Sequence, residues 1–406
     1  MPKLPNRRTP RDLRAGLTLA AVSAVVTLGA AAAYARDTNR AQAFVVGASP
    51  GIANGEGLDA CNTNRTRGHF PRAPQVALRI RVPGGIGQAP ASDSAGNLLL
   101  VHGEPQVSKL DSQGRTLWTV RLESEAASAP VLTADGDILV ISQEADALLL
   151  APSGKLRHEH RLPLAEPRHR TLAIPTANGG ALVASGKDLV ELSESAEVVR
   201  QTRTRANLTA IAESAFGLLA IGENGAVALA HATGDFEPIG SLGGAVADGA
   251  AVQGGRLFAV VDGHKLVALD LKTGSALTLA SDPAVGLSGP PTLFENQSSV
   301  VVADGGFLSL HAPSGGETLR VSIAEAARAF DPALRALRPA LTIGDAAGDV
   351  AASRSGSDAI VLQADGKAQR MDDTSCLDPF RPTPTLHGIV FACRSGQLFW
   401  VSDKAP

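Results

Sequence analysis

Short apolar runs recur along the chain after residue 70, and each is followed by a polar turn. The runs are too short for helices and too continuous for exposed strands, which favours strands buried on both faces. They are GNLLLV at 96–101, GDILVI at 136–141, GALVA at 180–184, GLLAI at 217–221, GRLFAVV at 255–261, SVVVA at 299–303 and GIVFA at 388–392, with a weaker run, GDVAA, at 348–352. The pattern predicts one strand-based unit repeated along the chain.

Each unit has the features of a small four-stranded sheet. The units start at a Pro or small residue that recurs about every 34 to 49 residues, near the ~40 to 50 residues of a propeller blade. These start residues are Pro90, Pro130, Pro175, Thr209, Ala250, Pro290, Pro339 and Pro384. The third and fourth strands of most units meet at a Gly-bearing turn such as 111–114, whereas the turn at 193–196 lacks the Gly.

The last unit ends at residues 398–402, with no room for a fourth strand. Residues 76–82 alternate apolar and polar side chains, as a half-exposed outer strand does, and no unit precedes them. We therefore expect this N-terminal strand to complete the last sheet and remove the open edges. The predicted fold is an all-β, eight-bladed β-propeller over residues 75–406, after an extended lead-in at 36–74. Seven blades are the alternative, if the weak unit near 348 is an insertion.

Residues 322–337 interrupt the repeat. The segment is rich in Ala, places its apolar residues at helical spacing, and has Asp331-Pro332 at its middle. This pattern predicts a helical insertion of two short helices between the sixth and seventh units. The insertion either packs on the propeller edge or binds a partner.

The N-terminus carries a targeting segment. Five cations precede an uncharged stretch at 15–33: Lys3, Arg7, Arg8, Arg11 and Arg14. The sequence Ala33-Tyr34-Ala35 then fits a small-x-small cleavage site, which predicts a signal peptide over residues 1–35. The stretch is also close to the ~20 residues that span a bilayer, so an uncleaved anchor at 15–33 is the alternative. Either way we expect an exported protein that is periplasmic or extracellular, or held at the inner membrane by residues 15–33.

Composition and charge exclude one class of partner and raise the question of a disulfide. The formal net charge is -3 and no long basic run follows the N-terminus, so nucleic-acid binding is not indicated. The 3 cysteines are Cys61, Cys376 and Cys393. In an oxidising compartment one disulfide is expected, first between Cys376 and Cys393, with Cys61 as the alternative partner. The chain-entropy model gives such a bridge about 3 kcal/mol.

Two segments carry a family resemblance. SKLDSQGRTLW at 108–118 and LVALDLKTGSAL at 266–277 resemble the "ALDxxTGxxLW" blade of PQQ-like propellers. The resemblance spans roughly residues 62–402, and NRTRG at 64–68 is similar to the lead-in of secreted members. The family includes quinoprotein alcohol dehydrogenases and the lipoprotein subunit of the outer-membrane β-barrel assembly machine. It therefore implies architecture better than activity.

Departures from the quinoprotein pattern favour the non-quinoprotein branch, which resembles the assembly lipoprotein. Quinoprotein dehydrogenases hold their cofactor with adjacent cysteines and a stacked Trp, but this chain has no adjacent cysteines and only Trp118 and Trp400. It also lacks a Cys-x-x-Cys-His haem motif. We expect no cofactor and no enzymatic activity.

Candidate chemistry is sparse. His158 and His160 flank Glu159 on a predicted outer strand, with His169 in the next loop, so a metal pair is one interpretation. The alternative is a solvated polar edge, because the nearby arginines would repel a cation. The acidic pairs and the Gly-rich run have turn roles instead: Asp135 with Asp137, Asp345 with Asp349, Asp372 with Asp373, and 84–87.

These observations predict a monomeric, non-catalytic propeller that serves as a protein-binding or assembly scaffold at the cell envelope. The alternatives are an envelope hydrolase or oxidoreductase with a degenerate site, and a ligand-binding extracytoplasmic sensor. No catalytic, cofactor or metal residue is assigned. The loops that join one blade to the next are the expected binding region, because loops carry function on a rigid scaffold.

Overall fold

The structure is a computed structural model, and it describes residues 51–403 with gaps. The residues outside the description are 1–50, 54–58, 60, 62–65, 67–68, 104, 166–170, 177–178, 231–235, 248, 282–285, 295–298, 304–306, 313, 323–340, 346, 348, 354–356, 365–366 and 404–406. Three sequence predictions therefore lie outside the described residues: the targeting segment 1–35, nearly all of the helical insertion 322–337, and His169.

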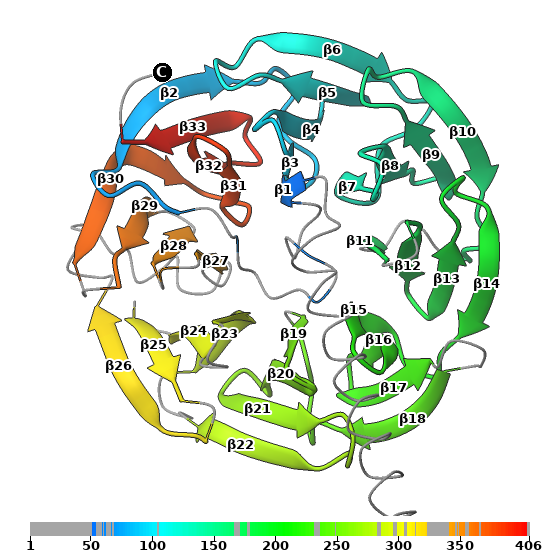
Figure 1. Ribbon diagram of the computed structural model, residues 1–406, viewed down its shortest axis with the longest axis vertical. Coiled ribbons are helices and arrows are strands. Elements are labelled where there is room, and N and C mark those ends of the chain that lie inside the picture. Colours follow the sequence, from blue (N-terminus) through cyan, green and yellow to red (C-terminus); the bar gives the residue numbers. More distant parts are fainter. Residues whose placement is uncertain are drawn as a thin grey trace, which may run out of the picture.

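Every regular element in the described residues is a β-strand, and the strands form eight antiparallel sheets arranged in a ring (Figure 1). Seven sheets have four strands, and the remaining sheet has a fifth strand at its inner edge. Apart from the two N-terminal strands, consecutive strands pair within each sheet, so the sheets are built mainly from local hairpins. This is the architecture of a β-propeller, and the predicted all-β propeller class is confirmed.

We number the sheets 1 to 8 around the ring, and in each the first strand lies nearest the centre. Sheet 1 contains β3 (Ala91–Asp93), β4 (Leu98–His102), β5 (Gln106–Leu110) and β6 (Thr116–Arg121), with β1 (Gly51–Ala53) beside β3. Sheet 2 contains β7 (Val131–Leu132), β8 (Ile138–Ile141), β9 (Asp146–Leu150) and β10 (Leu156–Arg161). Sheet 3 contains β11 (Thr171–Pro175), β12 (Ala181–Ser185), β13 (Asp188–Leu192) and β14 (Val198–Arg203). Sheet 4 contains β15 (Leu208–Ser214), β16 (Gly217–Gly222), β17 (Ala226–Ala230) and β18 (Phe236–Ser241).

The second half of the ring repeats this order. Sheet 5 contains β19 (Ala250–Gln253), β20 (Arg256–Val261), β21 (Lys265–Asp270) and β22 (Ala276–Ser281). Sheet 6 contains β23 (Leu287–Leu293), β24 (Ser299–Ala303), β25 (Phe307–His311) and β26 (Glu317–Ser322). Sheet 7 contains β27 (Leu341–Gly344), β28 (Val350–Ser353), β29 (Ser357–Leu362) and β30 (Ala368–Cys376). Sheet 8 contains β31 (Thr383–Thr385), β32 (Gly388–Ala392), β33 (Gln397–Ser402) and, outermost, β2 (Gln75–Arg81).

Sheet 8 closes the ring with strands from both parts of the chain. β2 pairs antiparallel with β33, from Gln75 opposite Ser402 to Arg81 opposite Gln397. The N-terminal strand therefore occupies the place that the C-terminal unit leaves empty, as the alternating pattern of 76–82 predicted. In Figure 1 this pairing joins the blue and red parts of the ring.

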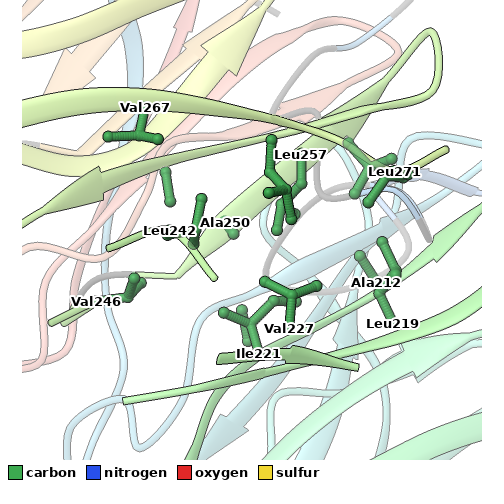
Figure 2. Close-up of a cluster of buried hydrophobic side chains, with 14 of the residues drawn as sticks. Ala212, Leu219, Ile221, Val227, Leu242, Val246, Ala250, Leu257, Val267 and Leu271 are labelled. Carbon is green, nitrogen blue, oxygen red and sulfur yellow. The ribbon is translucent and has the colours of Figure 1, made fainter. Parts of the chain in front are cut away.

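The hydrophobic core lies between neighbouring sheets rather than inside any one of them. Figure 2 shows the cluster between sheets 4 and 5, in which Leu219 and Ile221 of β16 face Leu257 of β20 across the gap. Similar clusters fill other gaps of the ring, built mainly from Ala, Val, Leu and Ile. With aromatic residues at only 3% of the chain, small aliphatic side chains let the sheets pack closely.

The outermost strands are irregular. A register shift interrupts the pairing of the outermost strand with its neighbour in each sheet, for example between Lys109 and Leu110 opposite β6. Such bulges increase the local twist and make an exposed edge a poor template for another strand. The rim is therefore unsuited to partners that bind by adding a strand.

Candidate interaction surface

The two ends of the ring differ in structure. At one end lie the turns that join the first strand of a sheet to the second and the third to the fourth; we call it the hairpin end. At the other end lie the turns between second and third strands and the connections between sheets; we call it the loop end. Function on a propeller is expected at loops held by the rigid sheets, so each end is a candidate surface.

Described residues of the N-terminal segment contact sheets on both sides of the ring centre, at the hairpin end. β1 pairs with β3 through Gly51 opposite Asp93, near the hairpin end of sheet 1. The carbonyl of Cys61 then accepts a hydrogen bond of 2.8 Å from the backbone N–H of Val252 on β19. β3 and β19 lie on opposite sides of the ring centre in Figure 1. The described parts of the segment therefore lie on both sides of the ring centre.

The same segment is then fixed to sheet 7. The backbone N–H of Thr66 donates to the carbonyl of Gly344 at 2.8 Å, and the N–H of Phe70 donates to Oδ2 of Asp345 at 2.8 Å. The Phe70 ring is buried in the cluster between sheets 7 and 8. The segment finally enters β2, so this end of the ring is covered in part by the protein's own chain.

Two buried carboxylates hold this segment. Asp345 and Asp349 are fully buried in the turn between β27 and β28. Oδ1 of Asp345 accepts the backbone N–H groups of Ala347 and Asp349, which leaves Oδ2 for Phe70. Oδ2 of Asp349 lies 3.4 Å from the guanidinium of Arg72. The sequence predicted turn roles for both residues, and nothing in it indicated that they also bind the lead-in.

A rigid cluster occupies the loop end where sheet 7 meets sheet 8. Cys376 at the end of β30 forms a disulfide with Cys393, with Cα atoms 5.9 Å apart, which is the first of the two pairings considered above. Asp378 pairs with Arg394 at 2.9 Å, and the Arg394 guanidinium lies 4.9 Å from the centre of the Phe380 ring. Between these contacts Leu377 is 72% exposed, the highest value among the exposed large apolar side chains of the described residues.

A Ser–His pair in sheet 1 has the hydrogen-bond geometry of a nucleophile beside a base. Nε2 of His102 lies 2.7 Å from Oγ of Ser108, which lies 2.7 Å from Oγ1 of Thr119. Burial lowers the pKa of His102, which would suit a general base. Ser108 is only 2% exposed, so its hydroxyl cannot reach a substrate. The network holds neighbouring strands together instead.

The histidines of β10 lie on an exposed outer strand. The rings of His158 and His160 stack at 6.2 Å between centroids. Arg157 beside them pairs with Asp137 at 3.1 Å, and burial raises the pKa of Asp137 against the opposing effect of Arg157. In the part of the chain that the structure describes, His, Cys, Asp and Glu form no group of three that could hold a metal ion.

The remaining acidic and glycine motifs lie in turns or on exposed strands. Gly84 and Gly85 form a tight turn after β2, followed by Ile86 bridging to His102. Asp372 and Asp373 were predicted to be turn residues, but both lie on the strand β30. Their carbonyls accept hydrogen bonds from Arg79 of β2 and thus help to hold the closing strand. Within the described ranges, no helix has the length and apolar character needed to cross a membrane.

One family model matches part of the chain. The family model described as outer membrane protein assembly factor BamB, a PQQ-type repeat, matches residues 73–209, which span sheets 1 to 3. This match confirms the resemblance noted in the sequence over residues 73–209. No curated protein matches it in sequence.

Solved structures share the fold over most of the chain. BamB from Moraxella catarrhalis is 14% identical, with a TM-score of 0.60 over 81% of this chain and 97% of that one. The computationally designed protein Ika8 is 12% identical, with a TM-score of 0.62 over 80% of this chain and 99% of that one. The WD40 domain of Neurospora crassa Pan2 is 11% identical, with a TM-score of 0.51 over 83% of this chain and 97% of that one. Proteins this different in sequence share architecture, and their activities do not transfer with it.

Proposed function

We propose that the chain is an exported, non-catalytic propeller of eight blades that acts as a protein-binding or assembly scaffold at the cell envelope. The observation that carries the proposal is the rigid cluster at the loop end, where the disulfide, the Asp378–Arg394 pair and the exposed Leu377 stand together. A large exposed apolar side chain on a pre-organised backbone suits a protein interface, because little conformational entropy is lost on binding. The match to the BamB family model supports the same role.

The domain assignment follows the sequence. We propose a signal peptide or anchor at 1–35, a lead-in at 36–74 and a monomeric propeller at 75–406. The complete four-stranded sheet formed by β27 to β30 supports eight blades over seven. The disulfide suits a periplasmic or extracellular protein, released or held by residues 15–33. N-terminal sequencing of the exported protein distinguishes cleavage from retention.

A pull-down from the native envelope tests the scaffold. The bait is the wild-type chain, the loop-end variant Leu377→Arg, or the hairpin-end control Leu277→Arg, whose leucine is 50% exposed. We expect a stable protein partner with the wild type and with Leu277→Arg, and at least a tenfold loss with Leu377→Arg. Turnover of a small-molecule panel without any stable partner would contradict the scaffold and favour the envelope enzyme.

A further inference from the structure

Exposed apolar side chains gather at one end of the ring. Seven large apolar side chains are exposed in the described residues: Leu117, Leu156, Val198, Val199, Leu277, Leu377 and Leu386. All except Leu377 lie at the hairpin end. Single exposed apolar residues are ordinary on any protein surface, but six of these seven share one end of the ring.

Their positions in the sheets are equivalent. Five of them are the first or second residue of an outermost strand, directly after a hairpin turn: Leu117, Leu156, Val198, Val199 and Leu277. Leu386 lies in the turn between β31 and β32. These side chains come from five sheets spread around the ring, so one partner that touches all of them must be broad and flat. A peptide in a groove cannot do so.

Charged side chains accompany two of these leucines. Arg115 precedes Leu117 by two residues, and Arg157 follows Leu156. Both pair with a carboxylate of their own sheet, yet their side chains stay 73% and 52% exposed. A leucine beside an arginine suits a membrane interface, where the apolar group enters the acyl boundary and the guanidinium reaches a phosphate.

The first described strand, β1, starts near the same end of the ring. β1 lies beside β3 near the hairpin end, and the apolar stretch 15–33 precedes it in the sequence. Residues 34–50 join the two, and at ~3.4 Å per residue they reach at most about 60 Å. If 15–33 stays in a bilayer, the hairpin end is therefore the end held close to it. This observation is independent of the exposed side chains.

We propose that the hairpin end docks on the surface of a lipid bilayer, with its six exposed apolar side chains inserted shallowly and the loop end directed away toward protein partners. The proposal rests on the envelope location given under Proposed function. A second copy of the chain is the competing occupant. The bilayer is favoured because the apolar side chains are separated by polar residues, whereas a stable dimer needs a continuous packed patch.

Vesicle flotation tests this surface. Protein purified from the envelope is mixed with vesicles of phosphatidylethanolamine and phosphatidylglycerol, either as wild type, as the triple variant Leu117→Ser, Leu156→Ser, Val199→Ser, or as the control Leu377→Ser. We expect the triple variant to lose about tenfold or more in vesicle partitioning, and the control to match the wild type. Thermal unfolding verifies that the variants are folded, since all four side chains are exposed.

Hydrogen exchange with and without vesicles gives a second readout. Protection of the outer-strand starts on β6, β10 and β14 supports docking. Equal partitioning of the triple variant overturns it, because binding then goes through residues 15–33 alone. Protection at the loop end, or a dimer in sedimentation without lipid, also overturns it. The pull-down scores a protein partner bound through Leu377 at the loop end, and flotation scores lipid binding through the hairpin end, so the scaffold can fail while lipid docking stands, and the reverse.

Discussion

At the scale of single residues, the contact between Trp118 and Gly154 sets how sheet 1 meets sheet 2. The indole Nε1 of Trp118 donates to the carbonyl of Pro152 at 3.0 Å. A Cβ at Gly154 would lie 2.8 Å from the indole Cδ2, and the φ of this glycine is +86°. The turn of sheet 3 has Ala196 at the equivalent place, with φ 61°. The outermost strand of the sheet before it, β10, contains no tryptophan. Glycine is therefore needed where the indole packs.

Replacing Gly154 with Ala should cost more stability than the same change at Gly243. Both glycines have φ near +80°, but a Cβ at Gly243 meets nothing within 4 Å. We expect about 1 kcal/mol of destabilisation at Gly243 from the backbone alone, and a further 1–3 kcal/mol at Gly154 from the clash with Trp118. Urea unfolding of both variants measures the difference. Equal losses would show that the indole moves aside at no cost.

Asp93 and Lys109 form an ion pair inside sheet 1, with 2.7 Å between Oδ2 and Nζ and side chains 14% and 10% exposed. Burial alone would raise the pKa of Asp93, but hydrogen bonds from Asn97 and Lys109 outweigh it and hold the pKa below 3.8. A carboxyl with a lowered pKa in the folded state stabilises the protein above its unfolded pKa. That stability is lost as the pH falls through the lower, folded pKa.

Asp93→Asn should therefore destabilise the protein by about 3 kcal/mol at pH 7, because it leaves the buried Lys109 ammonium without its carboxylate. The difference from the wild type should shrink as the pH falls below the usual range of an aspartate. Denaturant unfolding at pH 7 and pH 3 measures it. A difference that is the same at both values would mean that the ionised carboxylate adds nothing to folding.

At the scale of elements, the sequence predicted strands wherever an apolar run is buried on both faces. The second strand of each sheet was found in this way, for example β8 and β20, because its side chains fill the gaps on both sides. The innermost strands were not separable by pattern, since β7 has only two residues and β3 only three. Their pairing comes from the ring geometry, which no local pattern contains.

The path of the lead-in could not be predicted from sequence either. It depends on backbone N–H groups that meet carboxylates far away along the chain, such as Phe70 with Asp345 at a separation of 275 residues. The sequence around Asp345 and Asp349 predicts a turn, and both residues do lie in one, between β27 and β28. Their second role depends on which segment the closed ring brings beside them, and composition carries no information about that.

Asp345→Asn tests whether this carboxylate holds the lead-in. The variant has the same shape, but an amide nitrogen replaces one of the two oxygens, so one backbone N–H of Phe70, Ala347 or Asp349 loses its acceptor. We expect about 1–3 kcal/mol of destabilisation and faster hydrogen exchange at residues 66–72. Asp373→Asn, with the carboxyl 85% exposed, is the control. Unchanged exchange at 66–72 would assign the hold to Phe70 packing instead.

At the scale of the whole molecule, ring closure was predictable because it is a matter of counting strands. The last unit is one strand short, and one alternating segment stands unused before the first unit. The contacts that join the closing sheet to its neighbours could not be predicted in the same way. The disulfide joins sheet 7 to sheet 8, Arg79 of β2 binds carbonyls of β30, and Ile80 packs over Gly114 of sheet 1. The closing sheet is thus fixed to both neighbours.

Closure makes β2 different from every other outermost strand. Each of the others follows its partner in a local hairpin, whereas β2 pairs the N-terminal part of the chain with the C-terminal strand β33. We therefore expect loss of another outermost strand to fray one edge, and loss of β2 to weaken the closure of the ring. The variants Ile80→Pro and Val120→Pro compare disruption of β2 with disruption of β6, an outermost strand held in a local hairpin. Each proline disturbs the pairing of one outermost strand. Both residues are half-buried, and both pair inside an outermost strand, Ile80 with Leu398 and Val120 with Val107.

Each proline removes a ladder position and should cost about 3 kcal/mol locally. For Val120→Pro we expect faster hydrogen exchange confined to β6. For Ile80→Pro we expect faster exchange in β31 to β33 and in sheet 1 together, and a global unfolding midpoint lower than that of the control, because the sheets on both sides lose their packing at once. If both prolines fray only their own strand, the disulfide and the lead-in are enough to keep the ring shut without β2.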